Sequence, residues 1–195
     1  MSDRVRVILI TDGDRCAQHA IESIGVKLGL RCISASAGNP TPIEGEKIVK
    51  LLKTVPYDPV LVMFDDRGRE DKGNGETALE YVASHPDVEV LGAVAVASNT
   101  TGIDGVHADI CVNYCGDVTT SSVDKNGREK FTIDPQPMVN GDTVDILNNI
   151  NVPIIVGVGD IGKMNKADDI SRGSPITQKA IEEILTRNGI QCSQG

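Results

Sequence analysis

The stretch PVLVMFDDRG, residues Pro59–Gly68, joins an unbroken apolar run to two adjacent carboxylates. The large apolar residues Val60–Phe64 cannot alternate between a core and solvent, so both faces of this strand are predicted to be covered. Such coverage is typical of a central strand in a parallel sheet with helices on each side. Asp65 and Asp66 then lie at its carboxyl end, where open α/β sheets place their ligand crevice, and Gly68 permits a tight turn away from it.

The rest of the chain alternates apolar runs with amphipathic helical patterns. This alternation predicts an α/β fold with an open, mainly parallel sheet, Rossmann-like or flavodoxin-like, and helices on both faces. The pattern leaves the strand order open. Strands are expected at 5–11, 31–35, 60–64, 88–98 and 154–158, and helices are expected to end at 28, to span 44–55, 75–84 and 143–150, and to begin at 175.

Capping residues mark several of the predicted helix ends. Gly29 suits the left-handed position that ends the first helix. Asp142 is placed to cap the helix over 143–150, and Ser174 is placed to cap the last helix, which has Pro175 at its first position.

Residues 109–133 have a different character, with short alternating segments in place of long apolar runs. Asn126-Gly127 between two β-like runs predicts a hairpin. We therefore expect one domain over residues 1–195, with an antiparallel insertion at 109–133 that covers the crevice or an oligomer edge.

Composition excludes several classes of function. The 28 acidic residues outnumber the 19 basic ones and give a net charge of −9, which disfavours binding to nucleic acid. No apolar run approaches the roughly 18 to 20 residues of a membrane-spanning helix. No secretory signal is found, and any contact with a membrane is expected to be peripheral.

The cysteines and histidines give no catalytic pattern. The five cysteines form no CxxC pair, so we expect reduced thiols. Cys111 and Cys115 are expected to share a strand face and to pack there. His19, His85 and His107 have no metal-ligand neighbour at standard spacing and are interpreted as structural.

Carboxylates follow several of the predicted strands, and the ends of parallel strands meet at one edge of a sheet. Hard oxygen ligands of this kind suit Mg²⁺. The alternative is that these aspartates only cap helices or form turns. The predicted ligand-binding residues are Asp12, Asp14, Asp65, Asp66, Asp160 and Lys163, of which Asp12, Asp14, Asp65 and Asp66 are the candidate metal ligands.

The segment GVGDIGK, Gly157–Lys163, has the spacing of a nucleotide-binding P-loop. Met164 stands where that motif needs Ser or Thr, and no immediate helix follows, so a true P-loop is disfavoured. A glycine-rich loop with Lys163 could still hold a small anion. Gly-Asp pairs also recur, at 13–14, 116–117, 141–142 and 159–160.

Acidic residues after a first and a third parallel strand resemble the toprim domain, in which Mg²⁺ serves phosphoryl transfer. That family uses Glu after its first strand and Asp-x-Asp after its third, where this chain has Asp12-Gly13-Asp14 and Asp65-Asp66. A Mg²⁺-dependent phosphoryl-transfer or phosphate-ester enzyme is therefore kept as the alternative function, and a non-enzymatic role is favoured.

The sequence also resembles, over nearly its full length, the soluble form of the stage V sporulation protein AE family. The resemblance rests on VRVILITDGD, RCISASAGNPTP, YDPVLVMFDDRG, GAVAVASNT, NGDTVD, VGDIGKM and GSPITQKAIE. It implies a role in endospore formation, in an operon whose proteins move dipicolinic acid, as its calcium chelate, into the spore and out at germination. With this resemblance, Ca²⁺ joins Mg²⁺ as a candidate cation for the strand-end carboxylates.

The resemblance implies partners rather than catalytic residues. The partners would be other proteins of the dipicolinic acid transport machinery at the membrane, with a homo-oligomer as a further expectation. The implied location is the cytoplasmic side, or the periphery, of the spore inner membrane.

Overall fold

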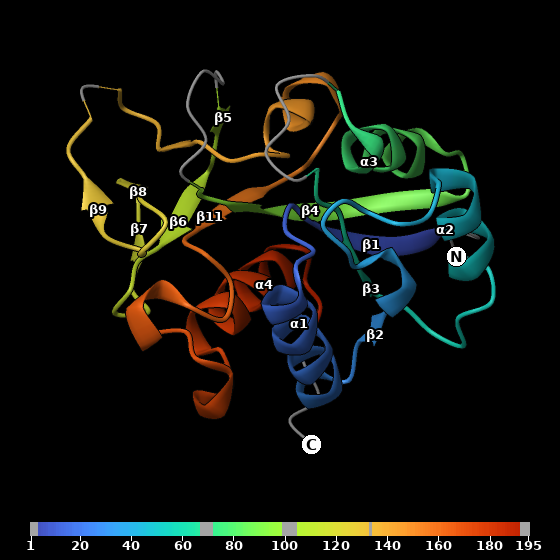
Figure 1. Cartoon of the computed structure of the whole chain (residues 1–195), viewed down its shortest axis with the longest axis horizontal. Coiled ribbons are helices and arrows are strands. Elements are labelled where there is room, and N and C mark those ends of the chain that lie inside the picture. Colours follow the sequence, from blue (N-terminus) through green and yellow to red (C-terminus); the bar gives the residue numbers. More distant parts are fainter. Residues whose placement is uncertain (1–3, 67–71, 99–104, 133, 192–195) are drawn as a thin grey trace.

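The computed structural model describes residues 4–66, 72–98, 105–132 and 134–191. The turn expected at Gly68 lies outside these residues. The described part of the chain forms a central sheet with helices on both faces and two small antiparallel sheets beside it (Figure 1). The predicted α/β fold with an open, mainly parallel sheet is confirmed.

The central sheet has the strand order β2-β3-β1-β4-β11-β6-β7. All neighbouring strands in it are parallel except β6 and β7. The chain places β2 and β3 on one side of β1 and then crosses to β4 on the other side. This reversal at β1 and β4 makes their carboxyl ends the topological switch point of the sheet. The strands are β1 (Val5–Ile10), β2 (Arg31–Cys32), β3 (Val60–Met63), β4 (Val88–Val96), β6 (Ile110–Val112), β7 (Val118–Thr119) and β11 (Ile155–Val158).

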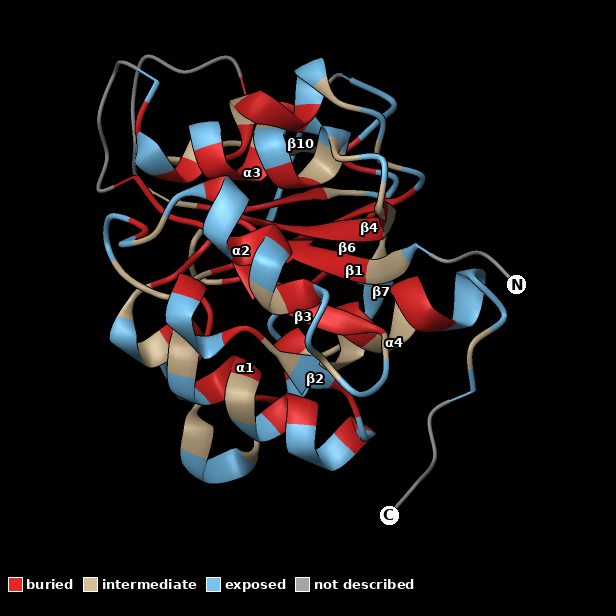
Figure 2. Cartoon of the chain, turned by 90° about the vertical axis from the view of Figure 1, so that its right-hand side faces the viewer, coloured by how far each residue is buried: buried red, intermediate tan, exposed pale blue. Residues whose placement is uncertain are grey.

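Two helical layers cover the sheet, because its long strands are apolar on both faces. The helices α1 (Arg15–Leu28) and α4 (Pro175–Arg187) pack on one face. The other face is covered by α2 (Gly45–Leu52), α3 (Asn74–Ser84) and the 3₁₀ helix η2 (Asp145–Asn149). Figure 2 shows the burial of the strands between these layers.

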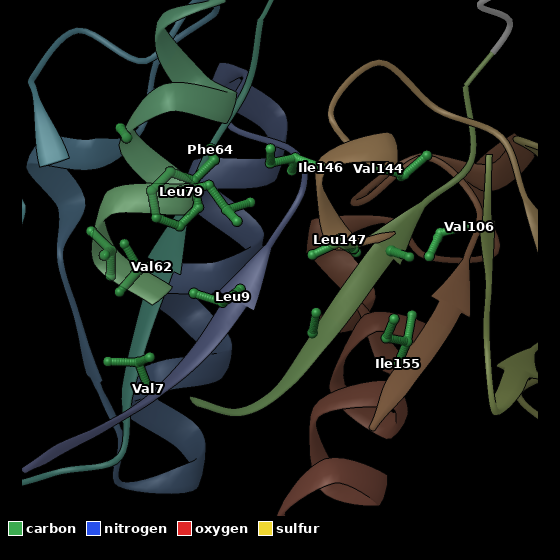
Figure 3. Close-up of a cluster of buried hydrophobic side chains, with 14 of the residues drawn as sticks. Val7, Leu9, Val62, Phe64, Leu79, Val106, Val144, Ile146, Leu147 and Ile155 are labelled. Atoms are coloured by element: carbon green, nitrogen blue, oxygen red, sulfur yellow. The ribbon is translucent and has the colours of Figure 1, made fainter. Parts of the chain in front are cut away.

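Side-chain alternation along β3 divides the core into two clusters. Leu61 and Met63 join the cluster under α1 and α4. Val62 and Phe64 join the cluster under α2 and α3, where they lie near Leu79 (Figure 3). None of the side chains of Val60–Phe64 has exposed surface, so the two-sided burial predicted for this strand is confirmed.

Several helix ends differ from those that the sequence predicts. Gly29 ends α1 in the left-handed conformation, as expected, with φ 68°. The segment after Asp142 forms only the short 3₁₀ helix η2, because Val152-Pro153 follows closely and no side chain caps the turn. Ser174 precedes α4, but its hydroxyl makes no capping bond.

The buried carboxylate of Asp168 replaces the Ser174 cap. It accepts the amide hydrogens of Ile176, at 2.8 Å, and Thr177, at 3.0 Å. It also accepts the Thr177 hydroxyl, at 2.6 Å, and the amide of Gly162, at 2.9 Å. Asp168 therefore ties the start of α4 to the loop that leaves β11.

The predicted hairpin is present in the 109–133 region. Strands β8 (Ser122–Val123) and β9 (Glu129–Lys130) pair antiparallel, and Gly127 in their turn has φ 74°. A second pair is formed by β5 (Val106–His107) and β10 (Met138–Val139). Part of the region nevertheless belongs to the main sheet, because β6 runs parallel to β11. Short 3₁₀ helices are η1 (Ser34–Ser36), η3 (Met164–Lys166) and η4 (Ile170–Arg172).

Truncating a core side chain of α3 is expected to destabilise the fold. Leu79→Ala should lower the free energy of unfolding by about 2 to 5 kcal/mol, because it removes buried methyl groups and leaves a cavity. Val26→Ala on α1 is the control, since Val26 is 84% exposed, and it should change stability by less than about 0.5 kcal/mol. Urea unfolding of both variants measures the difference, and equal effects would contradict the assigned core.

Candidate functional site

The ends of four parallel strands open into one small polar pocket. It has a volume of about 220 Å³ and lies at the topological switch point, beside the exits of β1 and β4. The exits of β3 and β11 contribute Asp65 and Asp160. The pocket is lined by Thr11, Asp12, Asp14, Asn39, Asp65, Val96, Ala97, Ser98, Lys125, Asp142 and Asp160.

Asp12 is one of two buried carboxylates in the pocket lining. It is 8% exposed, and its Oδ1 accepts the amide hydrogen of Asp14 at 3.2 Å. Its other oxygen accepts no hydrogen bond from the described residues. Burial raises the pKa of Asp12 well above its usual range, and the nearby charges of Asp14 and Asp65 raise this pKa further.

Asp65 lies beside Asp12, and both its carboxylate and its backbone form hydrogen bonds. Its Oδ2 accepts the amide hydrogen of Gly13 at 3.3 Å. Its backbone amide donates to the Thr41 hydroxyl at 2.9 Å, and its carbonyl accepts the Thr41 amide at 2.9 Å. The exits of β1 and β3 are therefore joined at this point.

Asp14 and Asp160 share one cation, the ammonium of Lys163. The Lys163 Nζ lies 2.7 Å from Asp14 Oδ2 and 3.0 Å from Asp160 Oδ1. Burial acts to raise the pKa of Asp14, but the bonds to Lys163 and to the amide of Ala17 outweigh it and leave this pKa lowered. Asp14 also caps α1 through that amide, so the capping alternative holds for this residue.

The contacts of Lys163 disfavour a P-loop role for the GVGDIGK motif. A P-loop lysine must be available to a bound phosphate, whereas the Lys163 ammonium is held between two carboxylates. Burial acts to lower the pKa of Lys163, but Asp14 and Asp160 outweigh it and raise this pKa. The structure offers no support for an anion-binding role of Lys163.

Asp66 does not line the pocket, although it is adjacent to Asp65. Its carboxylate accepts the amide hydrogens of Gly75, at 2.6 Å, and Glu76, at 2.7 Å, at the start of α3. Consecutive side chains of a strand point to opposite faces, so Asp65 faces the α1 side and Asp66 the α3 side. This difference could have been predicted from the sequence, because the alternation of side chains along the preceding strand, continued to Asp65 and Asp66, points them to opposite faces of the sheet.

The β8–β9 hairpin contributes Lys125, a pocket residue that sequence reasoning missed. The carbonyl of Lys125 accepts the amide hydrogen of Asp160 at 2.7 Å. A side chain at Gly159 would lie 2.6 Å from the Gly127 amide and the Lys125 carbonyl, so only glycine permits this approach. The hairpin therefore packs on the end of β11 and covers this part of the crevice.

Asp142 and Ser98 complete the wall beside β4. The Ser98 hydroxyl donates to Asp142 Oδ1 at 2.7 Å. Asp142 was predicted only as a helix cap, but the recurring Gly-Asp pairs held a signal for it. Three of the four pairs, at 13–14, 141–142 and 159–160, place their aspartate in the pocket lining, and Asp117 lies elsewhere.

The histidines and the described cysteines lie outside the pocket lining. Cys111 is buried in β6, and burial raises its pKa to about 12. Cys115 is exposed beyond the end of that strand, so the expectation that it shares a strand face with Cys111 is wrong. The chain turns after β6, which ends at Val112.

Few protein ligands for a metal are brought together. Within the described residues, no three His, Cys, Asp or Glu side chains are grouped so that they could hold a metal ion. Of the four predicted metal ligands, Asp12, Asp14 and Asp65 line the pocket, and Asp14 is paired with Lys163. The lining suits a small polar ligand that carries positive charge.

The fold and the pocket together define a class, that of open-sheet α/β proteins with an acidic pocket at the switch point of the sheet. A family model described as Stage V sporulation protein AE1 matches residues 6–188. The chain therefore belongs to the stage V sporulation protein AE family and is a sporulation protein. No curated protein and no solved structure matches the chain.

Removing the Asp12 charge is expected to change how stability depends on pH. Because the pKa of Asp12 is raised in the folded protein, its stabilising contribution is complete below about pH 4 and is lost as pH rises through the folded pKa. Asn cannot ionise, so the Asp12→Asn variant does not lose this stability. Its free energy of unfolding, relative to that of the parent, should therefore increase with pH. Urea unfolding between pH 4 and 7 measures this, and a constant or decreasing difference would contradict it.

Asp66 is expected to act as a helix cap. Asp66→Ala should lower the free energy of unfolding by about 1 to 2 kcal/mol, because the amides of Gly75 and Glu76 lose their acceptor. The exposed Asp117→Ala is the control and should stay within about 0.5 kcal/mol of the parent. Unchanged stability of the Asp66 variant would show that the carboxylate does not hold α3.

Proposed function

We propose that this sporulation protein acts without catalysis in the movement of dipicolinic acid, as its calcium chelate, into the developing spore and out during germination. The observation that carries the proposal is the family match over residues 6–188. Apart from Val5, the sequence motifs that resemble this family lie in the same span. The chemistry of the strand-end pocket is compatible with a ligand of this kind.

The pocket favours binding over catalysis. Its described lining contains carboxylates, hydroxyls, an amide and one lysine, but no histidine or cysteine that could act as base or nucleophile near neutral pH. The nearby ammonium of Lys163 is engaged by Asp14 and Asp160. A protein with such a site is suited to holding a polar ligand.

The alternative, a toprim-like Mg²⁺-dependent enzyme, has no observation in its favour. Such an enzyme would need the carboxylates of the third strand to face the same cation as those of the first. Asp66 instead binds the start of α3, and only Asp65 of that pair lines the pocket. The non-enzymatic role is therefore the one proposed.

We propose that the protein works at the cytoplasmic side or the periphery of the spore inner membrane, with membrane proteins of the transport machinery as partners. None of the helices in the described part of the chain combines the length and apolarity needed to cross a membrane. Within this proposal, contact with the membrane is made through those partners.

The proposal is tested in the endospore-forming source of the chain. Spores that lack this gene should hold less dipicolinic acid, or release it more slowly at germination, than the parent, as measured by terbium fluorescence. Re-expression of the unaltered chain or of the Asp117→Asn control should restore both values. Normal content and normal release in the deletion strain would contradict the proposed function.

A further inference from the structure

The loop between β11 and α4 concentrates the backbone strain of the described chain. Four non-glycine residues among those that the structure describes have a positive φ, and all four lie in this loop. They are Met164 (44°), Asn165 (52°), Lys166 (71°) and Ser174 (46°). A left-handed conformation is uncommon for a residue with a side chain, and glycine and asparagine tolerate it best. Contacts elsewhere must hold three such residues in succession, and strain of this kind is typical of segments with two conformations.

The second half of the loop is anchored by a buried carboxylate. Asp168 has no exposed surface and accepts the amide hydrogens of Ile176 and Thr177 at the start of α4. It also accepts the Thr177 hydroxyl and the amide hydrogen of Gly162, where the loop leaves β11. Leaving a buried donor or acceptor without its partner is costly, so Asp168 keeps the base of the loop closed.

The strained first half is held in part by ion pairs that reach solvent. The Lys163 Nζ lies 2.7 Å from Asp14 Oδ2 and 3.0 Å from Asp160 Oδ1. The Lys163 side chain is 43% exposed, so water and dissolved salt compete with both ion pairs. These contacts are therefore easier to break than those of the buried Asp168 carboxylate.

Met164 provides the second contact of the strained half. Its side chain is buried in the core under α1 and α4. A Cβ added at Gly127, in the turn of the β8–β9 hairpin, would lie 3.1 Å from Met164 Sδ. Asn165 and Lys166, which follow, are exposed. The burial of Met164 against the hairpin offsets the strain of the turn that carries it.

We propose that Lys163–Lys166 is a latch poised to open. When the two ion pairs of Lys163 break, the left-handed turn relaxes and draws Met164 away from the hairpin, while the buried anchor stays in place. Opening leaves the carboxylates of Asp14 and Asp160, which line the pocket, without their cation. The closed latch thus lowers the negative charge of the pocket wall, and the open latch restores it. This latch does not depend on the proposed function, because it follows from the loop alone.

Amide hydrogen exchange of the full chain, followed by NMR at single residues, tests the latch. The probes are the amides of Lys163 and Ala167, which donate to backbone carbonyls at 3.2 and 3.0 Å. The amides of Ile176 and Thr177, bonded to Asp168, report on the anchor. Protection of the latch amides should be lower by roughly tenfold or more, because local opening breaks only their hydrogen bonds.

Two changes should open the latch further. Lys163→Met removes both ion pairs and keeps most of the side-chain length, so protection of the latch amides should fall by roughly tenfold. Raising NaCl from about 0.01 M to about 1 M should lower it in the unaltered chain, because salt screens partly exposed charges. Protection of the anchor amides should stay the same in both experiments. The salt series needs no variant and therefore does not depend on how Lys163→Met folds.

One substitution should close the latch more tightly. Lys166→Gly relieves strain, because glycine adopts a positive φ at no steric cost, so protection of the latch amides should rise by roughly two- to fivefold. Lys130→Gly is its control, since Lys130 lies in β9 and is not among the residues with positive φ. This control should not raise protection of the latch amides.

A matched control for the loss of a lysine ion pair lies on α4. Lys179→Met removes an ammonium that is 2.7 Å from Glu183, outside the loop, and should leave exchange in the latch unchanged. Circular dichroism establishes that every variant is folded.

Three results would overturn the latch. The first is equal protection of the latch and anchor amides in the unaltered chain, since the loop would then open only together with the start of α4. The second is latch protection that neither Lys163→Met nor salt lowers. The third is a loss of protection in Lys166→Gly as large as that in Lys163→Met, because relief of strain would then not favour the closed form.

Discussion

The structure depends on the burial of both faces of its parallel strands. β1, β3, β4 and β11 carry apolar side chains on each face, and each face needs its own helical layer to exclude water. Helical crossovers between parallel strands bring every strand out at the same edge. The polar residues that follow the apolar runs are therefore gathered at one place, and the pocket is a consequence of how the core is built.

Gathering carboxylates in a small volume has an electrostatic cost, and the fold reduces that cost with local partners. Lys163 stands between Asp14 and Asp160, and Ser98 donates to Asp142. Asp168 holds the loop that carries Lys163, through the Gly162 amide. Burial raises the pKa of Asp12, and the charges of Asp14 and Asp65 raise it further, while the Asp14 amide lowers it only in part.

Sequence reasoning located four of the eleven described residues that line the pocket, and its errors have physical causes. Asp12, Asp65 and Asp160 converge because parallel strand ends share an edge. Asp66 was grouped with them, although side-chain alternation turns it to the opposite layer, where it caps α3. Lys125 was missed because nothing local in a hairpin shows which strand end that hairpin will cover.

Taken alone, the sequence determined the layered α/β architecture, the two-sided burial of Val60–Phe64, the hairpin at Asn126-Gly127 and the family. These follow from local periodicity, turn chemistry and motifs, which act over a few residues. The sequence did not determine the place of the Val60–Phe64 strand, which was predicted to be central and is second from the edge of the sheet. The strand order, the cap by Asp168 and the place of Lys125 in the pocket lining were decided only by the tertiary structure. Each joins segments far apart in the chain, and such contacts are set by how whole elements pack.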